Sequence, residues 1–185
     1  MLKRIRQYFF NRELSKCERK SNFRSWNDIH SILLLFESDF QEKNDSVRAL
    51  IKWCVAEGKK VVACCFVDKK NAESASLDNY VVLDRSKVDW LQKPQNVKER
   101  VKSKFDVVID LTDNDVIPLK YVLIWANSDF RCGKNRGENN NLYYDFVIEM
   151  PKSPIDPKTN RVRLDYDFEK ELSSQIVKYL KMINS

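Results

Sequence analysis

Four aspartates surround an apolar stretch at residues 105–115, FDVVIDLTDND. Asp113 and Asp115 stand two residues apart, and this Asp-x-Asp spacing can supply carboxylates to Mg²⁺, which takes one or two of them plus waters. The same two residues can instead accept backbone N–H bonds at the start of a helix, where the positive end of the helix dipole favours an anion. The residue types favour helix capping, and they place Asp106 in solvent at the start of its strand.

Two acidic loops follow buried strands that we expect to be neighbours in a parallel sheet. In an open α/β sheet, ligands bind beyond the carboxyl ends of the strands, where crossovers leave to opposite faces. If the strand order is 3-2-1-4-5, this switch point lies between the first and fourth strands, beside Asp110. The candidate ligand-binding side chains there are Glu37, Ser38, Asp39, Thr112, Asp113 and Asp115.

The scarcity of glycine argues against the usual nucleotide-binding motifs. The chain has three glycines, and neither acidic loop contains one. A phosphate cradle needs backbone N–H groups unshielded by side chains, as in G-x-G-x-x-G and the P-loop. His30 is the single histidine, so a histidine-based zinc site or a Ser-His-Asp arrangement has little support. We therefore assign no cofactor, no metal and no catalytic residue.

The elements that position these residues alternate as in an α/β sheet. Strands are predicted at residues 31–36, 60–68, 79–84, 106–111, 129–132 and 144–150, and the continuous apolar run at 31–36 indicates burial on both faces. Apolar residues at helical spacing predict helices at residues 45–58, 94–103, 116–127 and 165–183. We predict a three-layer, Rossmann-like domain over residues 27–185, with a mostly parallel sheet of about five or six strands and a C-terminal helix docked on it.

The excess positive charge lies at the start of the chain. The net charge is +6, and the first 24 residues hold eight basic side chains against two acidic ones. Leu2, Ile5 and Phe9 share one helical face, so residues 1–26 are predicted to form a basic amphipathic arm. A second basic segment, CGKNRGENNN at residues 132–141, is either a solvated loop or an anion contact. The candidate anion- or RNA-binding side chains are Lys3, Arg4, Arg6, Arg12, Arg19, Lys20, Lys134 and Arg136.

Three partners fit the basic arm. It can bind RNA through phosphate contacts, with Tyr8, Phe10, Phe23 or Trp26 stacking on bases. It can also lie on an anionic membrane surface, or dock on its own domain. We expect a non-enzymatic module that attaches through the arm to RNA or a ribonucleoprotein. The alternatives are a small metal-dependent hydrolase or sugar-phosphate enzyme that uses the strand-end aspartates, and a peripheral membrane protein.

The expected cellular location follows from the apolar runs and the cysteines. The longest apolar runs are far shorter than the ~20 residues that cross a bilayer, and the arm lacks the apolar core of a secretory signal. Five cysteines are an odd number, and Cys64 and Cys65 are adjacent in a strand, so they point to opposite faces. Cys132 is expected to be a buried, inert thiol. We expect a cytoplasmic protein with reduced thiols, and the oligomeric state stays open.

Four segments resemble a family of short, uncharacterised bacterial proteins known only as a domain of unknown function. They are SILLLFESDF, GKKVVACCFVDKK, FDVVIDLTDNDVIPLKYVLIWANSDFRCGK and LYYDFVIEM. This resemblance covers roughly residues 27–183 and implies a shared fold without an established activity.

A second resemblance is to the N-terminal, acceptor-side domain of heptosyltransferase-type glycosyltransferases. There a strand similar to FDVVIDLT precedes a helix, followed by a strand ending in Arg-x-Gly, here Arg131-Cys132-Gly133, and by a Tyr-Asp pair, here Tyr144-Asp145. The resemblance covers about half of the chain and implies a Rossmann-like fold. We expect no transferase activity, because 185 residues leave no room for the second domain that binds the sugar nucleotide in that family.

Overall fold

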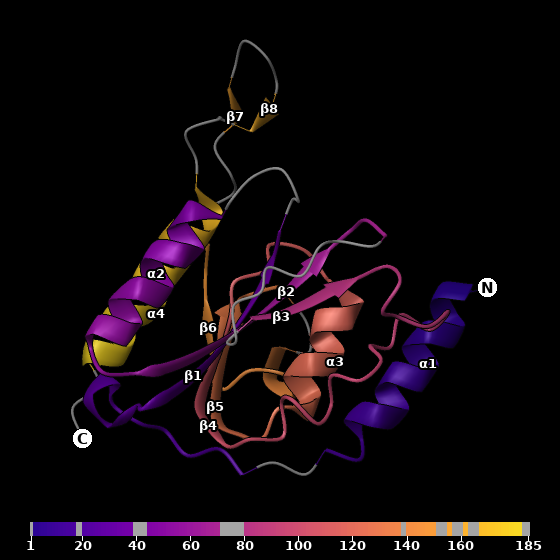
Figure 1. The fold of residues 1–185 in the computed structure, drawn as a ribbon, viewed down its shortest axis with the longest axis horizontal. Helices are drawn as coiled ribbons and strands as arrows, with labels where there is room; N and C mark the ends of the chain where they lie inside the picture. The colour runs from indigo at the N-terminus through magenta and orange to yellow at the C-terminus, as the bar shows by residue number, and fades with distance from the viewer. Residues whose placement is uncertain are drawn as a thin grey trace.

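A six-stranded parallel sheet with the order β3-β2-β1-β4-β5-β6 forms the centre of the molecule (Figure 1). The computed structural model describes residues 2–17, 20–38, 44–70, 80–137, 140–150, 155–156, 161–162 and 167–182. The strands are β1 Ser31–Glu37, β2 Lys60–Val67, β3 Tyr80–Asp84, β4 Phe105–Asp110, β5 Ser128–Lys134 and β6 Phe146–Ile148. All five pairings are parallel, which confirms the predicted α/β fold class and strand order.

Helices cover both faces of the sheet (Figure 1). Two helices lie on one face, α2 Asp45–Ala56 and α4 Phe168–Met182. On the other face are α3 Ile117–Trp125 and, packed against it, α1 Leu2–Leu14. The shorter elements are the 3-10 turns η1 Trp26–Asp28 and η2 Asn140–Leu142, and the antiparallel pair β7 Ile155–Asp156 and β8 Arg161–Val162. Because α2 and α3 leave β1 and β4 toward opposite faces, the switch point lies between these two strands, as predicted.

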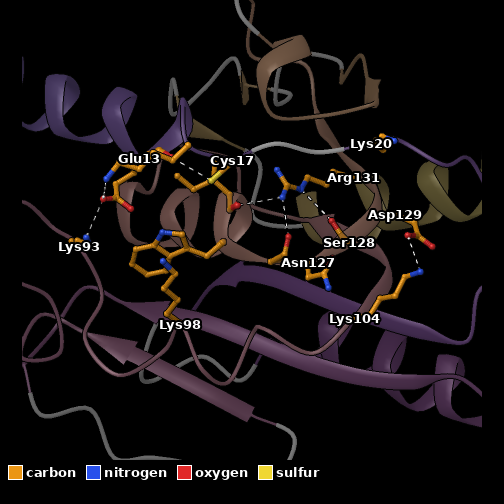
Figure 2. A pocket seen from close by; sticks show the side chains of 14 residues that line it. Glu13, Cys17, Lys20, Lys93, Lys98, Lys104, Asn127, Ser128, Asp129 and Arg131 are labelled. Carbon is orange, nitrogen blue, oxygen red and sulfur yellow. Dashed lines mark hydrogen bonds and ion pairs between the residues drawn. The ribbon is translucent and has the colours of Figure 1, made fainter.

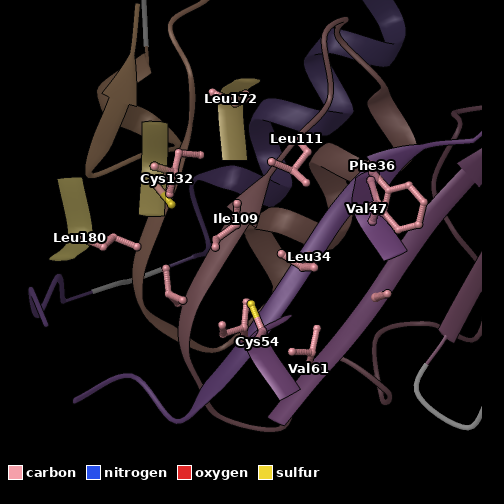
Figure 3. Close-up of a cluster of buried hydrophobic side chains, with 14 of the residues drawn as sticks. Leu34, Phe36, Val47, Cys54, Val61, Ile109, Leu111, Cys132, Leu172 and Leu180 are labelled. Atoms are coloured by element: carbon pink, nitrogen blue, oxygen red, sulfur yellow. The ribbon is translucent and has the colours of Figure 1, made fainter. Parts of the chain in front are cut away.

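The central strands are buried on both faces, and alternate residues enter two separate cores. Leu34 and Phe36 of β1 face α2 and α4, together with Ile109 of β4 (Figure 3). Leu33 and Leu35 face α3. This two-sided burial explains why the strands read as continuous apolar runs rather than alternating ones.

The thiols follow the same alternation. Cys64 belongs to the core under α3 and Cys65 to the core under α2 and α4, which confirms that the two point to opposite faces. All five cysteines are free thiols. Complete burial raises the pKa of Cys132 well above its ordinary value of 9.0, so this thiol is inert, as predicted. No helix in the described ranges is long and apolar enough to cross a membrane.

The helix predicted at residues 94–103 is wrong, because this segment consists of turns. Asn96 has a φ of 58°, in the left-handed region that a right-handed helix cannot contain. Pro94 forms an antiparallel bridge with Val88 instead of opening a helix. Val97 and Val101 are nevertheless buried in the core under α3, so the apolar positions were identified correctly and their secondary structure was not.

The N-terminal helix α1 packs on the domain through a different face from the one expected. Leu2 and Ile5 are exposed, whereas Phe10 is only 3% exposed. The Phe10 ring meets the Tyr121 ring of α3 edge-on, with the ring centroids 5.0 Å apart. The buried side chain of α1 is therefore an aromatic residue that the sequence had suggested for base stacking.

Candidate functional site

At the carboxyl end of β4, the Asp110 carboxylate is buried and fully engaged. It is 2% exposed. Its Oδ1 accepts hydrogen bonds from the Thr112 backbone N–H at 2.9 Å and from the Thr112 hydroxyl at 2.7 Å. Its Oδ2 accepts from the Tyr144 hydroxyl at 2.5 Å and lies 3.3 Å from Nη1 of Arg136. Both oxygens are thus occupied by groups of the protein itself.

Arg136 supplies the positive charge that balances this carboxylate. Its Nη1 donates to the Tyr144 hydroxyl at 2.6 Å, and its Nη2 donates to the Thr112 carbonyl at 2.5 Å and to the Thr112 hydroxyl. Burial opposes the charged guanidinium, but Asp110, Tyr144 and Asp115 outweigh it and raise the Arg136 pKa. Burial and then Asp110 raise the pKa of Tyr144 well above 10.0, so a neutral phenol donates to the carboxylate.

Gly133 on β5 makes room for this arrangement. A Cβ at this position would lie 2.8 Å from Cε1 of Tyr144 and 3.3 Å from the Cβ of Asp110. The first distance is shorter than real carbon–carbon contacts. The missing side chain therefore lets the Tyr144 ring cross β5 and reach Asp110.

The other strand-end aspartates are ion-paired rather than used as helix caps. Lys134 Nζ lies 2.5 Å from Asp113, and Lys120 Nζ lies 2.7 Å from Asp115. The residue that precedes α3 is Val116, and no side chain caps this helix. The capping interpretation of Asp113 and Asp115 is therefore wrong, because lysines compete successfully for both carboxylates.

The structure brings most of the predicted switch-point residues together. Glu37 is half-buried near them, and its pKa is raised by burial and by the charges of Asp113 and Asp110. The Ser38 hydroxyl lies 3.1 Å from Oδ1 of Asn44. Asp39 lies outside the described residues. Lys134 and Arg136, which the sequence suggested as a separate anion site, join this acidic cluster and balance its charge.

Asp106, the aspartate predicted to lie in solvent, is buried. It is 9% exposed, and Oδ2 accepts from the backbone N–H groups of His30 at 2.8 Å and Ser31 at 2.9 Å. Burial opposes its charge, but these bonds and Arg24 lower the Asp106 pKa overall. The prediction failed because this residue ties the start of β4 to the start of β1. The described side chains form no group of three or more potential metal ligands.

A cleft of about 850 Å³ lies at the amino ends of β4 and β5 (Figure 2). Its walls come from the end of α1 and the residues after it, from the turns between β3 and β4, and from the connection between α3 and β5. We call it the lysine cleft. Its charged lining consists of Lys16, Lys20, Lys93, Lys98, Lys104 and Arg131, with Glu13 and Asp129.

Basic side chains outnumber acidic ones in the lysine cleft. Glu13 is shared by Lys16 at 3.5 Å and Lys93 at 3.4 Å, and Asp129 lies 3.2 Å from Lys104. Among the residues that the structure describes, Lys20 and Lys98 have no carboxylate partner. The cleft therefore presents more positive charge than its own carboxylates neutralise.

Arg131 forms the floor of the cleft and acts on the protein itself. The side chain is buried, and Nη2 donates to the Ala126 carbonyl at 2.9 Å, while Nε donates to the Ser128 hydroxyl at 3.1 Å. Ala126 ends α3, so the guanidinium neutralises the negative end of that helix. The five lysines, rather than Arg131, supply the charge that a ligand can reach.

The predicted residues of the arm are dispersed. Arg4 and Arg12 are exposed on α1, and Nε of Arg6 donates to the Trp90 carbonyl at 3.0 Å. Lys20 joins the lysine cleft. The side chain of Lys3 and the whole of Arg19 lie outside the described residues.

The suggested stacking residues differ in exposure. Phe10 and Trp26 are buried, and Trp26 stacks on Trp53 with ring centroids 5.1 Å apart. Tyr8 is 64% exposed. Phe23 is partly exposed, but its ring packs edge-on against Phe130, with centroids 4.3 Å apart. Tyr8 is thus the suggested aromatic that most clearly faces solvent.

The sequence reasoning missed Lys93, Lys98 and Lys104. A signal was present, because residues 92–104 contain five basic side chains against one acidic side chain. Averaging charge over the whole of residues 25–185 concealed this local excess. Asp110 was considered only as a carboxylate of the alternative enzyme, and Tyr144 was not assigned to a site, since only the fold shows that β6 returns beside β5.

Family comparison agrees with the first of the two resemblances seen in the sequence, the one to a domain of unknown function. A model of a family of unknown function, DUF6913, matches residues 3–183, so the chain belongs to that family. No curated protein and no solved structure matches the chain.

Proposed function

We propose that this member of the DUF6913 family is a non-enzymatic module that attaches to RNA or a ribonucleoprotein through the lysine cleft and the basic arm beside it. The observation that carries the proposal is the charge excess in the cleft, where five lysines from two chain segments surround two carboxylates and a buried arginine. RNA supplies a line of phosphates that such a surface can neutralise.

The geometry of the cleft suits phosphate better than a small neutral ligand. Lys16 and Lys20 reach the cleft from the residues after α1, and Lys93, Lys98 and Lys104 reach it from the turns between β3 and β4, so lysines line the cleft along its length (Figure 2). Lys20 and Lys98, which lack a carboxylate partner among the described residues, need not break an ion pair to bind a phosphate. Binding then releases counterions from the nucleic acid, which makes affinity fall with salt.

The alternative enzymatic function has less support. A metal-dependent hydrolase needs strand-end carboxylates that are free to hold a cation, and Asp110, Asp113 and Asp115 are each engaged by Arg136, Lys134 or Lys120.

Attachment to an anionic membrane through α1 remains the competing use of the basic arm. The proposal also assigns the protein to the cytoplasm of a bacterial cell, and it keeps the likeness to heptosyltransferase-type domains as an inference about fold alone.

The test measures binding of a labelled 20-nucleotide oligouridylate by fluorescence anisotropy over a salt series. A variant carrying Lys93→Gln and Lys98→Gln should bind more weakly at low salt. Its slope of log K against log salt should fall by about 1.4, since each single-strand phosphate contact contributes ~0.7. The matched control is Lys170→Gln with Lys178→Gln, because both lysines are exposed on α4, across the sheet from the cleft.

Two results would contradict the proposal. In one, the cleft variant keeps the affinity and salt slope of the unmodified protein. In the other, the α4 control loses as much affinity as the cleft variant, which would show that any two positive charges serve equally well.

A further inference from the structure

We infer that the exposed indole of Trp90 is a base-stacking platform beside the lysine cleft, and that the RNA bound by this protein is therefore single-stranded. This inference rests on the proposed function and specifies the class of nucleic acid. Trp90 is 61% exposed, a large fraction for the largest apolar side chain. Tyr8, 64% exposed on α1, meets the Phe9 ring edge-on with centroids 5.6 Å apart, and the Phe9 ring in turn meets the Trp90 ring.

The backbone around Trp90 is held firmly, although its side chain is exposed. The Asp89 carboxylate accepts from the backbone N–H groups of Leu91 at 2.8 Å and Lys93 at 2.9 Å. The Gln92 N–H donates to the Asp89 carbonyl at 2.9 Å, which closes a four-residue turn with Trp90 at its second position. The indole is therefore presented on a fixed support, which lowers the entropy lost when a base stacks on it.

Helix α1 fixes the same turn from the other side. Nε of Arg6 donates to the Trp90 carbonyl at 3.0 Å, and the Phe9 ring meets the Trp90 ring edge-on, with centroids 6.4 Å apart. Helix α1 therefore contacts the indole on one side, while most of the indole surface stays in solvent. The arm and the turn together form one surface.

This turn connects the aromatic surface to the lysine cleft. Lys93 follows Trp90 by three residues, pairs with Glu13 at 3.4 Å and lines the cleft. Lys93 and Lys98 also lie over the Trp125 ring, at 5.6 Å and 5.7 Å from its centroid, which holds both ammonium groups at the cleft wall. An indole beside a row of ammonium groups matches a strand whose bases and phosphates are both accessible.

Only a single strand offers that combination. In a duplex the base faces are covered by their neighbours, so Trp90 would have nothing to stack on, whereas the phosphates would still reach the lysines. The positive charge around the indole favours this occupant over a neutral protein surface.

The experiment compares Trp90→Ala with the unmodified protein on four probes at one salt concentration. The probes are the 20-nucleotide oligouridylate, an abasic strand of the same length, an RNA duplex, and vesicles of phosphatidylcholine and phosphatidylglycerol at about three to one. The variant should bind the oligouridylate about tenfold more weakly. Its binding to the abasic strand and the duplex, and its salt slope, should be unchanged.

Controls separate stacking from a general effect of the substitution. Trp90→Phe should recover most of the lost affinity, because a phenyl ring also stacks. Tyr179→Ala, which removes a partly exposed aromatic ring from α4, should leave binding unchanged. Unfolding midpoints of all variants should match that of the unmodified protein, because the indole makes few buried contacts.

Each remaining outcome has one meaning. If Trp90→Ala binds oligouridylate as tightly as the unmodified protein, the stacking inference is overturned. If lysine substitutions weaken RNA binding while Trp90→Ala does not, the proposed function stands and only this inference fails. If the lysine substitutions have no effect, the proposed function itself fails. If Trp90→Ala releases the protein from vesicles without changing RNA affinity, the aromatic surface is a membrane contact.

Discussion

At the carboxyl ends of β4 and β5, basic and acidic side chains satisfy one another, whereas at the amino ends of the same strands the basic side chains are in excess. Asp110 and Arg136 form the centre of the first region, with Tyr144 and Thr112 between them. The lysine cleft forms the second region. In α/β sheets, ligands usually bind at the carboxyl ends of the strands, which is the first region. Only in the second region, however, do basic side chains outnumber the carboxylates that could neutralise them.

Burial explains the difference between the two regions. A charge removed from water must be paired and hydrogen-bonded, so the partly buried Arg136 and the buried Asp110 are committed to each other. Lysines at the mouth of an open cleft stay hydrated, so Lys20 and Lys98 keep their charge without a carboxylate partner among the described residues. Residue types alone therefore do not identify a binding site, because the same guanidinium or ammonium group is structural in one place and available in another.

The largest expected effect comes from breaking the paired region. Asp110→Ala leaves the Arg136 guanidinium, the Tyr144 hydroxyl and the Thr112 N–H without their common acceptor. We expect the free energy of unfolding to fall by about 3–5 kcal/mol, measured by urea denaturation. Asp113→Ala is the matched control, because its ion pair with Lys134 is more exposed, and it should cost about 1 kcal/mol or less. Equal losses in the two variants would show that the Asp110 network stabilises the fold no more than the more exposed ion pair of Asp113 does.

A smaller loss is expected from crowding the same region. Gly133→Ala places a Cβ against the Tyr144 ring and should lower the free energy of unfolding by about 1–3 kcal/mol. Adding Tyr144→Leu removes the ring, so the alanine should cost less in that background than in the unmodified protein. A double-mutant cycle in urea measures the difference, and strict additivity would refute the proposed contact.

The buried Asp106 near the amino ends of the strands predicts a dependence on pH. Its folded-state pKa is lowered below 3.8, so its stabilisation is present above that pH and is lost as pH falls through the folded-state value. Asp106→Asn should reduce stability by about 1 kcal/mol at neutral pH. Thermal unfolding between pH 6 and pH 3 should show the two proteins converging as the solution becomes more acidic. A constant difference would contradict the ionised carboxylate.

The smallest effect on stability is expected in the lysine cleft. Lys98→Gln should change the free energy of unfolding by less than about 0.5 kcal/mol, because its ammonium group has no carboxylate partner among the described residues. The same variant should lower the salt slope of oligouridylate binding by about 0.7. A large loss of stability in Lys98→Gln would remove the contrast between the two regions.

Local patterns predicted most of the fold. Short apolar runs identified the central strands of the sheet, and the order 3-2-1-4-5 considered for the first five strands agrees with the structure. The failures had different causes. Asp113 had the residue type of a helix cap, but α3 begins at Ile117 after Val116, and Asp113 pairs with Lys134 of β5. Residues 94–103 had a helical spacing, but the left-handed backbone of Asn96 interrupts it.

The sequence by itself determined the α/β class, the burial of the strands and the basic character of the arm, because each depends on neighbours within a few residues. Tertiary structure alone decided which charges are available. Arg136 meets Asp110, and Lys93 meets Glu13, only after segments distant in the sequence have been brought together. Pairing of charges depends on distance and burial, and neither quantity is encoded in the spacing of residues along the chain.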